Sequence, residues 1–139
     1  MGGIDNRKEQ KIEISCGCII IENEKVLLIY DNNNNWGFPK GHMEEGETEV
    51  ETAKRETKEE THIDVSVDES KRYEIEYVTN KKVNRKVIYF LARKLNGKEI
   101  PQHGEVDAIK WFSIDEALET LKYDNVKEVL RKVAEDIAK

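Results

Sequence analysis

One continuous segment, Glu47–Thr61, constrains the fold of this chain more than any other. It contains no glycine and no proline and is rich in residues that favour helices, so it predicts an α-helix. Successive residues of a helix are rotated by about 100° around its axis. At that spacing Val50, Ala53, Thr57 and Thr61 form one stripe. We therefore expect a helix that packs this stripe against a sheet.

A second face of the same helix gathers glutamates. Glu49, Glu56, Glu59 and Glu60 fall within about 100° of one another around the axis. Glu56 stands three and four residues before Glu59 and Glu60, and each such like-charge pair costs roughly a few tenths of a kcal/mol. A solvated helix face is one interpretation. A bound divalent cation is the other, because Mg²⁺ prefers carboxylate oxygens and would offset the repulsion.

Around this helix, the apolar runs are shorter and partly alternate with polar residues, as is typical of β-strands. Strands are expected at 12–22, 25–30, 63–78, 86–95 and 109–112, with 63–78 forming one or two of them. Turns are expected at 23–24 and 80–84, and a polar loop at 31–35. Glycine and proline make a regular helix impossible at 36–41.

Two further helices are expected near the C-terminus. Ser113 followed by Glu116 has the capping-box spacing, which predicts a helix from there to about Leu121. The segment 126–138 predicts a final helix, whose apolar face would consist of Val126, Val129, Leu130 and Val133. Strands interspersed with few helices indicate the α/β class, with a mixed sheet packed between helices.

The acidic composition limits the classes of partner. The net charge is -6, whereas nucleic acid and anionic membranes attract proteins with an excess of Lys and Arg. Neither is therefore expected as a partner. In addition, no apolar run approaches the ~18 residues that cross a bilayer. An acidic enzyme can still bind a polyphosphate where a divalent cation bridges the two negative partners.

The chain length and the cysteines bear on domain organisation and compartment. A length of 139 residues fits one domain. Residues 1–10 are polar and lack a signal-peptide core, so we expect a flexible N-terminal tail followed by a single domain at 11–139. Cys16 and Cys18 point to the same face of a strand, where a disulfide would be strained. Buried, reduced thiols without an export signal predict a cytoplasmic protein.

The segment from Gly41 to Ile63 resembles the Nudix box, G-x5-E-x7-R-E-U-x-E-E-x-G-U with U apolar. Seven of the nine specified positions match, namely Gly41, Glu47, Arg55, Glu56, Glu59, Glu60 and Ile63. Thr57 stands where the pattern has an aliphatic residue, and His62 where it has the second glycine. Thr57 would weaken core packing, and His62 would change the end of the helix, because glycine relaxes the left-handed position there.

The resemblance implies a fold, a cofactor and roles for particular residues. The fold is the Nudix α/β/α sandwich with a mixed sheet. Glu56, Glu59 and Glu60 would bind Mg²⁺, or Mn²⁺ as the alternative ion, and the loop residue Glu105 would be a further ligand and a catalytic residue. The proton acceptor would be Glu56 or a loop glutamate. Gly41 would be structural, and Glu47 and Arg55 would form the ion pair that fixes the loop before the helix.

The surroundings of the box resemble one branch of the family, the asymmetric diadenosine tetraphosphate hydrolases. The resemblance begins with the segment Trp36–Glu47, continues with 77–78, 86–92 and 105–112, and covers about residues 14–133. It implies that Lys40 and His42 contact the polyphosphate. It also implies that Tyr77 and Tyr123 stack on an adenine ring. The alternative interpretations are a solvated loop acid for Glu105, a plain loop lysine for Lys40, and partly buried aromatics for the two tyrosines.

This resemblance implies Mg²⁺-dependent hydrolysis of diadenosine tetraphosphate to ATP and AMP, with a small-molecule nucleotide as the partner. Triphosphorylated RNA ends, nucleoside triphosphates or sugar nucleotides are alternative substrates, and a non-catalytic nucleotide-binding module is the alternative class. Glu49 matches no specified position of the box and is expected to be a solvated acid. Tyr89 is expected in the core or on the sheet surface rather than as a ligand contact. A basic cluster, Lys81, Lys82, Arg85 and Lys86, would either steer substrate or be a solvated turn.

Overall fold

A long strand, β1 (Ile12–Glu22), is the centre of the molecule in this computed structural model, which describes residues 12–139. It pairs in parallel with β6 (Asn84–Asn96) and antiparallel with β2 (Lys25–Asp31) and β4 (Lys40–His42). The remaining strands extend the sheet antiparallel: β5 (Asp64–Val78) on β6, and β3 (Trp36–Gly37) and β7 (Val106–Ser113) on β2. The tail expected at residues 1–10 lies outside the described residues.

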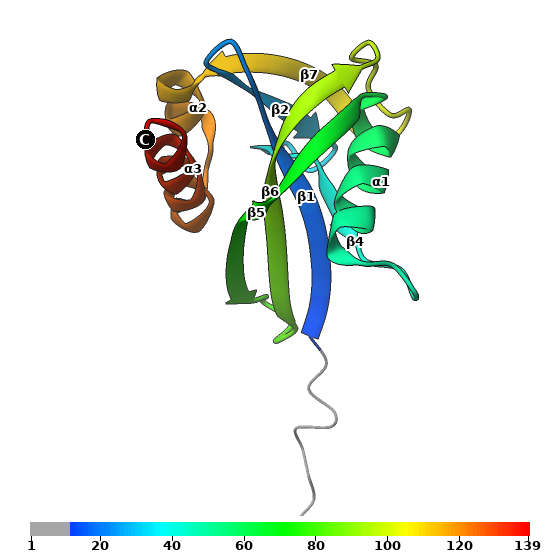
Figure 1. Ribbon diagram of the computed structural model, residues 1–139. Coiled ribbons are helices and arrows are strands. Elements are labelled where there is room, and N and C mark those ends of the chain that lie inside the picture. The colour runs from blue at the N-terminus through cyan, green and yellow to red at the C-terminus, as the bar shows by residue number, and fades with distance from the viewer. Residues whose placement is uncertain (1–11) are drawn as a thin grey trace, which may run out of the picture.

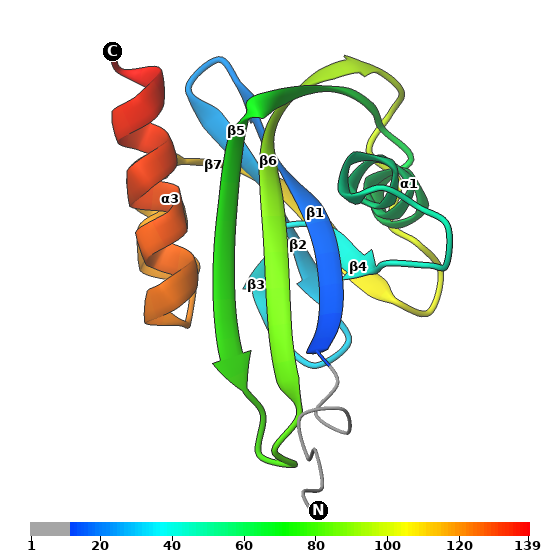
Figure 2. The ribbon, with the colours of Figure 1, turned by 60° about the horizontal axis from the view of Figure 1, so that its bottom comes forward.

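The sheet lies between helices, as Figures 1 and 2 show. Helix α1 (Glu49–Thr61) covers one face, and α2 (Ile114–Thr120) and α3 (Asp124–Ile137) cover the other. The predicted mixed sheet in an α/β/α sandwich is therefore confirmed.

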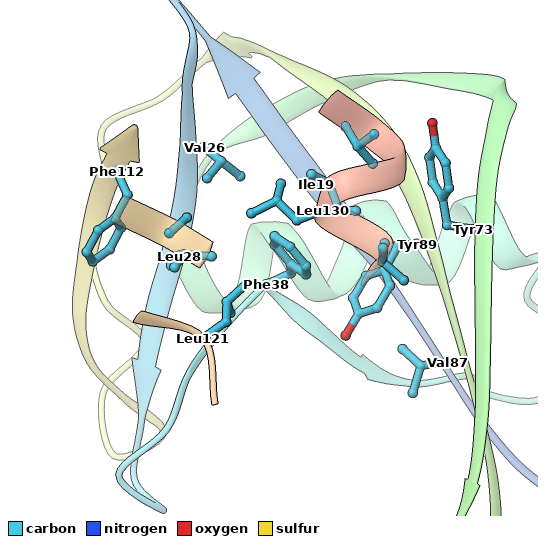
Figure 3. Close-up of a cluster of buried hydrophobic side chains, with 13 residues drawn as sticks. Ile19, Val26, Leu28, Phe38, Tyr73, Val87, Tyr89, Phe112, Leu121 and Leu130 are labelled. Carbon is cyan, nitrogen blue, oxygen red and sulfur yellow. The ribbon is translucent and has the colours of Figure 1, made fainter. Parts of the chain in front are cut away.

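Alternation along the central strands produces two cores, because successive side chains of a strand point to opposite faces. In β1, Ile19 packs towards α2 and α3, whereas Cys18 and Ile20 pack towards α1. In β2, Leu28 and Leu27 divide in the same way. Figure 3 shows the core beside α3, where Phe38 and Tyr89 meet edge to face with ring centroids 5.2 Å apart. Tyr89 is a core residue, as expected.

Helix α1 begins and ends at identifiable signals. Thr48 is the N-cap and forms a reciprocal capping box with Glu51, so the helix starts two residues later than the expected Glu47. The predicted stripe is confirmed, because Ala53, Thr57 and Thr61 are buried together with Thr52, and Val50 packs against the same core.

The two departures from the box pattern have different structural effects. The Thr57 hydroxyl is buried and makes no full hydrogen bond within residues 12–139; its polar neighbour is the Cys18 thiol. His62 itself adopts the left-handed conformation (φ 64°) in which glycine is normally found, and its amide donates to the Lys58 carbonyl. The helix therefore ends at the position the pattern specifies, without the glycine.

The C-terminal elements and the cysteines agree with the sequence-based expectations. Ser113 and Glu116 form the predicted capping box of α2. The apolar face of α3 packs into the core through Val129, Leu130 and Val133. Cys16 and Cys18 are fully buried and free. Among residues 12–139, no helix is long and apolar enough to cross a membrane.

Residues 64–78 form one strand, interrupted by an irregularity between Asp68 and Arg72, which is one of the two expected arrangements. One strand boundary needs correction. Strand β7 begins at Val106, three residues before the expected 109, because it pairs along β2 as far as Asp31.

Candidate active site

Gly41 and Glu56 bring strand β4 and helix α1 into direct contact. A Cβ atom placed on Gly41 would lie 2.0 Å from Cδ of Glu56. Real Cβ atoms do not approach so closely, so only glycine lets the carboxylate lie against the β4 backbone. The glycine of the motif is therefore explained by the space that this glutamate occupies.

Arg55 connects the loop before α1 with the glutamates on it. Its Nη2 donates to Oε1 of Glu47 at 3.0 Å and to the carbonyl of His42 at 2.9 Å. Its Nη1 donates to Glu56 at 2.9 Å and to Glu59 at 3.2 Å. The predicted ion pair between Glu47 and Arg55 is present, and the same guanidinium also lies between two of the candidate metal ligands.

Glu47 has a second set of contacts that fix the loop. Its carboxylate accepts from the amide of Glu44 at 2.9 Å and from the hydroxyl of Thr52 at 2.7 Å. The hydrogen bond from Arg55, followed by these two, lowers the pKa of Glu47 to about 2. The loop before α1 is thus held by an ionised carboxylate.

Burial has the opposite effect on two other glutamates of α1. Loss of hydration and, to a smaller extent, the charge of Glu56 raise the pKa of Glu60 to about 8, against the hydrogen bond from the Lys40 amide (2.9 Å). Burial also raises the pKa of Glu56, with Arg55 acting in the opposite direction and Glu59 adding to the increase. Glu59 is more exposed than either.

These carboxylates fit a divalent cation chemically. Three hard oxygen donors lie on neighbouring turns, and two of them have raised pKa values, which means that their negative charges lack full compensation. Within residues 12–139, no three acidic, imidazole or thiol groups already converge as a metal cluster. The Arg55 guanidinium lies between Glu56 and Glu59 and donates to both.

A cavity of about 610 Å³ opens beside Glu60. Aromatic residues form much of its wall, and Lys40, Glu60 and Arg85 are charged groups on it. The aromatic side chains in the wall are Trp36, Phe38, Tyr77, Tyr89 and Tyr123. The cavity therefore joins an apolar, aromatic space to the carboxylate face of α1.

The candidate substrate-binding residues do not all lie in this cavity. Lys40, Tyr77 and Tyr123 are in its wall. Tyr77 is half-buried, whereas Tyr123 is 52% exposed and forms the N-cap of α3. His42 is exposed and lines a separate, open hollow next to Glu44 and the loop before α1.

Glu105 lies at the end of the 97–105 loop, immediately before β7. This loop contacts the C-terminal end of α1, where the Gln102 amide donates to the Glu60 carbonyl at 3.2 Å. The side chain of Glu105 is exposed. Its loop is thus adjacent to α1, whereas the carboxylate itself forms no hydrogen bond with Glu56, Glu59 or Glu60.

Several residues have roles that the motif does not indicate. Glu49, expected to be a solvated acid, forms a two-point ion pair with Arg72 of β5 at 2.8 and 3.0 Å. Trp36 and Phe38 contribute to the cavity wall, which their position in a Trp-Gly-Phe-Pro segment could have indicated. Arg85 also lies there and is paired with Glu13 at 2.9 Å.

The other residues of the basic cluster lie in different surroundings. Lys86 lies 3.7 Å from Glu74. Lys81 and Lys82 are exposed in the turn between β5 and β6. Only Arg85 of this cluster reaches the cavity wall.

Comparison with known proteins identifies relatives over most of the chain. A family model described as NUDIX domain matches residues 11–133. The asymmetrical bis(5'-nucleosyl)-tetraphosphatase of Rattus norvegicus is 41% identical over 111 residues, which cover 77% of this chain and 75% of that protein. The same enzyme of Sus scrofa is 35% identical over 134 residues, covering 85% and 90% of the two chains.

Solved structures of related hydrolases share this fold over most of the chain. A binary complex of the C. elegans Ap4A hydrolase has a TM-score of 0.81 and 27% sequence identity, covering 91% of this chain and 98% of that one. A hydrolase of Nitrosomonas europaea at 18% identity has a TM-score of 0.79, which is a likeness of fold.

Proposed function

The chain belongs to the NUDIX family, and on that premise we propose that it hydrolyses diadenosine tetraphosphate to ATP and AMP with the help of a divalent metal ion. Water would add to one phosphorus of the bridge, and the bond from that phosphorus to a bridging oxygen would break. The observation that carries the proposal is the cavity, since its aromatic wall reaches Lys40 and Glu60. An adenine ring requires an aromatic surface, and the phosphate chain attached to the adenosine requires charged groups beside that surface.

Tyr77 and Tyr123 are the proposed adenine-binding residues. They come from β5 and from the start of α3, and both belong to the cavity wall. Stacking on an aromatic face contributes about 1–3 kcal/mol per base in nucleic-acid complexes. Neither ring is one of the buried core residues, and of the two only Tyr77 packs against them.

Lys40 and His42 are the proposed contacts to the polyphosphate. They are two residues apart in β4, so their side chains leave the strand on the same face. A lysine acts as a compact positive charge against phosphate oxygens. Lys40 is in the cavity wall and His42 lies beyond it, and so we propose that the phosphate chain extends out of the cavity along β4.

Glu56, Glu59 and Glu60 would hold the metal ion, and Glu105 would join them from its loop. NUDIX hydrolases generally use a divalent metal; Mg²⁺ is the proposed ion here and Mn²⁺ its substitute. When bound, the ion supplies neutralisation of phosphate charge and a lower pKa for bound water. Glu56 or Glu105 would accept the proton of the attacking water. Arg55 supports this role, because it donates to both Glu56 and Glu59 and offsets part of the increase that burial causes in the pKa of Glu56.

The two buried thiols support a further proposal, that the protein works in the cytoplasm. Cys16 and Cys18 are free and fully buried, a state that a reducing compartment maintains. Their burial raises the pKa of both thiols, to about 12 for Cys16 and about 11 for Cys18, so neither is a reactive thiolate at neutral pH.

Product analysis by chromatography tests the proposed function. The purified protein is incubated in the presence of Mg²⁺ with one substrate at a time. The substrates are diadenosine tetraphosphate, a nucleoside triphosphate, a sugar nucleotide and a triphosphorylated RNA. We expect ATP and AMP in equal amounts from the first substrate, which should also have the highest kcat/KM. Faster cleavage of another substrate would contradict the substrate assignment. No cleavage of any substrate with Mg²⁺ or Mn²⁺ would favour a binding module.

A further inference from the structure

The 97–105 loop between β6 and β7 is attached to the end of the carboxylate helix. Its main chain donates two hydrogen bonds to carbonyls of α1, from Ile100 to Thr61 at 3.0 Å and from Gln102 to Glu60 at 3.2 Å. In Figure 1 the loop, coloured yellow, runs beside the C-terminal end of α1. The C-terminal end of α1 therefore fixes the main chain of this loop at Ile100 and Gln102, before the loop continues to β7.

The ring of His62 adds a side-chain contact to this attachment. Nδ1 of His62 lies 2.7 Å from the carbonyl oxygen of Ile100. A carbonyl only accepts, so Nδ1 is the nitrogen that carries hydrogen here. The contact depends on the left-handed backbone of His62, and Gly97 permits it because a Cβ there would lie 2.5 Å from the His62 carbonyl oxygen. A glycine at position 62 could not form it.

Asn32 holds the other end of the loop. Its Nδ2 donates to the carbonyl of Gly104 at 3.3 Å, across 72 positions of sequence. Asn32 is presented by a fixed turn, in which Oδ1 of Asp31 accepts from the amides of Asn33 at 2.8 Å and Asn35 at 3.1 Å. Asp31 and Asn35 also line the cavity. The asparagine-rich loop thus connects the cavity rim to the residue that precedes Glu105.

Glu105 depends on these contacts for its position. Within residues 12–139 its own hydrogen bonds are made by its main chain, where the amide donates to the Gln102 carbonyl at 3.2 Å. Gly104 beside it has φ 84°, a conformation that few residues other than glycine adopt. A turn of this kind has few contacts of its own, so the neighbours that hold both of its sides limit where the main chain of Glu105 can lie.

We propose that His62 and Asn32 are positioning residues, which hold the two ends of the 97–105 loop so that Glu105 faces the carboxylates of α1. The inference rests on the proposed function, because it takes Glu105 as the loop glutamate of the reaction. His62 departs from the family pattern at this position, so its latch is a feature of this chain. The Asn32 contact gives the asparagine-rich loop a role, because no other step of the proposed reaction involves this loop.

Amide hydrogen exchange in the metal-free protein tests the latches without reference to activity. His62→Gly and His62→Asn both tolerate a left-handed backbone and lack the ring, and Asn32→Ala lacks the amide donor. In all three variants we expect faster exchange at the loop amides, by about fivefold for the loss of one hydrogen bond of average strength. Asn33→Ala, which changes the neighbouring exposed side chain, is the matched control and should leave exchange unchanged.

Kinetics with Mg²⁺ and diadenosine tetraphosphate tests the positioning role. The His62 and Asn32 variants should lower kcat about tenfold, as expected for residues that orient another group, while KM changes little. In a Glu105→Gln background the same changes should have no further effect on kcat, because the group they position has been removed. The thermal midpoint of His62→Gly should change little, because the loss of the His62–Ile100 hydrogen bond and the relief of the left-handed backbone act in opposite directions.

Three results would overturn the inference. Unchanged loop exchange in the His62 and Asn32 variants would show that they are not latches. An equal loss of kcat with and without Glu105 would show that they act elsewhere. A normal kcat in Glu105→Gln would remove the group they position, while the proposed hydrolysis would still stand on the product analysis, so the two failures can be told apart.

Discussion

Gly41 occupies the space beside the Glu56 carboxylate so closely that a methyl group at position 41 would lie 2.0 Å from Glu56 Cδ. The two residues are 15 positions apart and belong to different elements, β4 and α1. Their contact couples the strand that carries Lys40 to the helix that carries the candidate ligands. Single substitutions at this contact and around it therefore test how the site works.

Gly41→Ala should displace the Glu56 carboxylate and lower turnover by at least about 100-fold, the usual effect of misplacing a reacting group by about 1 Å. The alanine backbone itself is not strained, since Gly41 does not have a positive φ. Turnover and the thermal midpoint should be measured together. For the midpoint, Gly37→Ala is the matched control, because a Cβ there meets nothing within 4 Å. A Gly41→Ala enzyme with normal turnover would contradict this account of the contact.

Glu59→Gln and Glu60→Gln should each lower turnover at least ~100-fold and leave the fold intact, because each removes a candidate metal ligand. Steady-state rates at saturating Mg²⁺ and circular dichroism provide the two readouts. Glu49→Gln is the control on the same helix. Glu49 is paired with Arg72, so its replacement should affect stability alone. Near-normal rates in either ligand variant would exclude that residue as a ligand.

Thr57→Val should stabilise the protein by about 1 kcal/mol, because it replaces a buried hydroxyl that lacks a full hydrogen bond by a methyl group of the same shape. Thr52→Val on the same buried face should destabilise it, since Thr52 donates to Glu47 at 2.7 Å. Urea unfolding with unchanged m-values separates the two. Destabilisation in both variants would mean that the Thr57 hydroxyl has an interaction with the Cys18 thiol worth more than its desolvation.

The Glu47–Arg55 pair should make stability depend on pH in acid. The pKa of Glu47 is lowered from 4.5 to about 2 in the folded chain. Its stabilisation is therefore fully present above about pH 4.5 and is lost as the pH falls through about 2. Glu47→Gln should lower the free energy of unfolding at pH 7. The difference from the original chain should shrink towards zero as the pH falls to about 2. A difference that does not vary with pH would contradict the assignment.

Tyr123→Ala should raise KM for diadenosine tetraphosphate about tenfold or more, as the loss of one stacked base predicts, and leave kcat nearly unchanged. Tyr123→Phe keeps the ring face and should behave like the original chain. Initial rates over a range of substrate concentration distinguish the two. Equal KM values in all three proteins would remove Tyr123 from the adenine site and leave Tyr77 as the single candidate.

The elements could be predicted because each depends on nearby residues. The helix at α1 follows from a run without glycine or proline, and α2 from the spacing of Ser113 and Glu116. The ion pair of Glu47 and Arg55 could be expected from the resemblance to the Nudix box, and it is present.

What could not be predicted depends on which distant segments meet. The Glu49–Arg72 pair, the Asn32–Gly104 bond and the parallel pairing of β1 with β6 are set by the register of strands far apart in sequence. A one-residue shift of register moves every side chain to the other face of a sheet, so spacing along the chain does not determine such contacts. The cavity is of this kind, because its wall comes from Glu60 and from separate segments at 29–40, 75–89 and 121–126.

Glu60 is a junction of three segments, since its carboxylate accepts from the Lys40 amide and its carbonyl from the Gln102 amide. Its side chain is thereby ordered when the domain folds, before any ligand arrives. An ion that binds there meets one donor whose rotational freedom has already been lost, whereas Glu59 is half exposed and retains more of its own. Affinity for the ion should consequently gain from Glu60 mainly through prior order, whereas the more mobile Glu59 can adjust to ions of different radius.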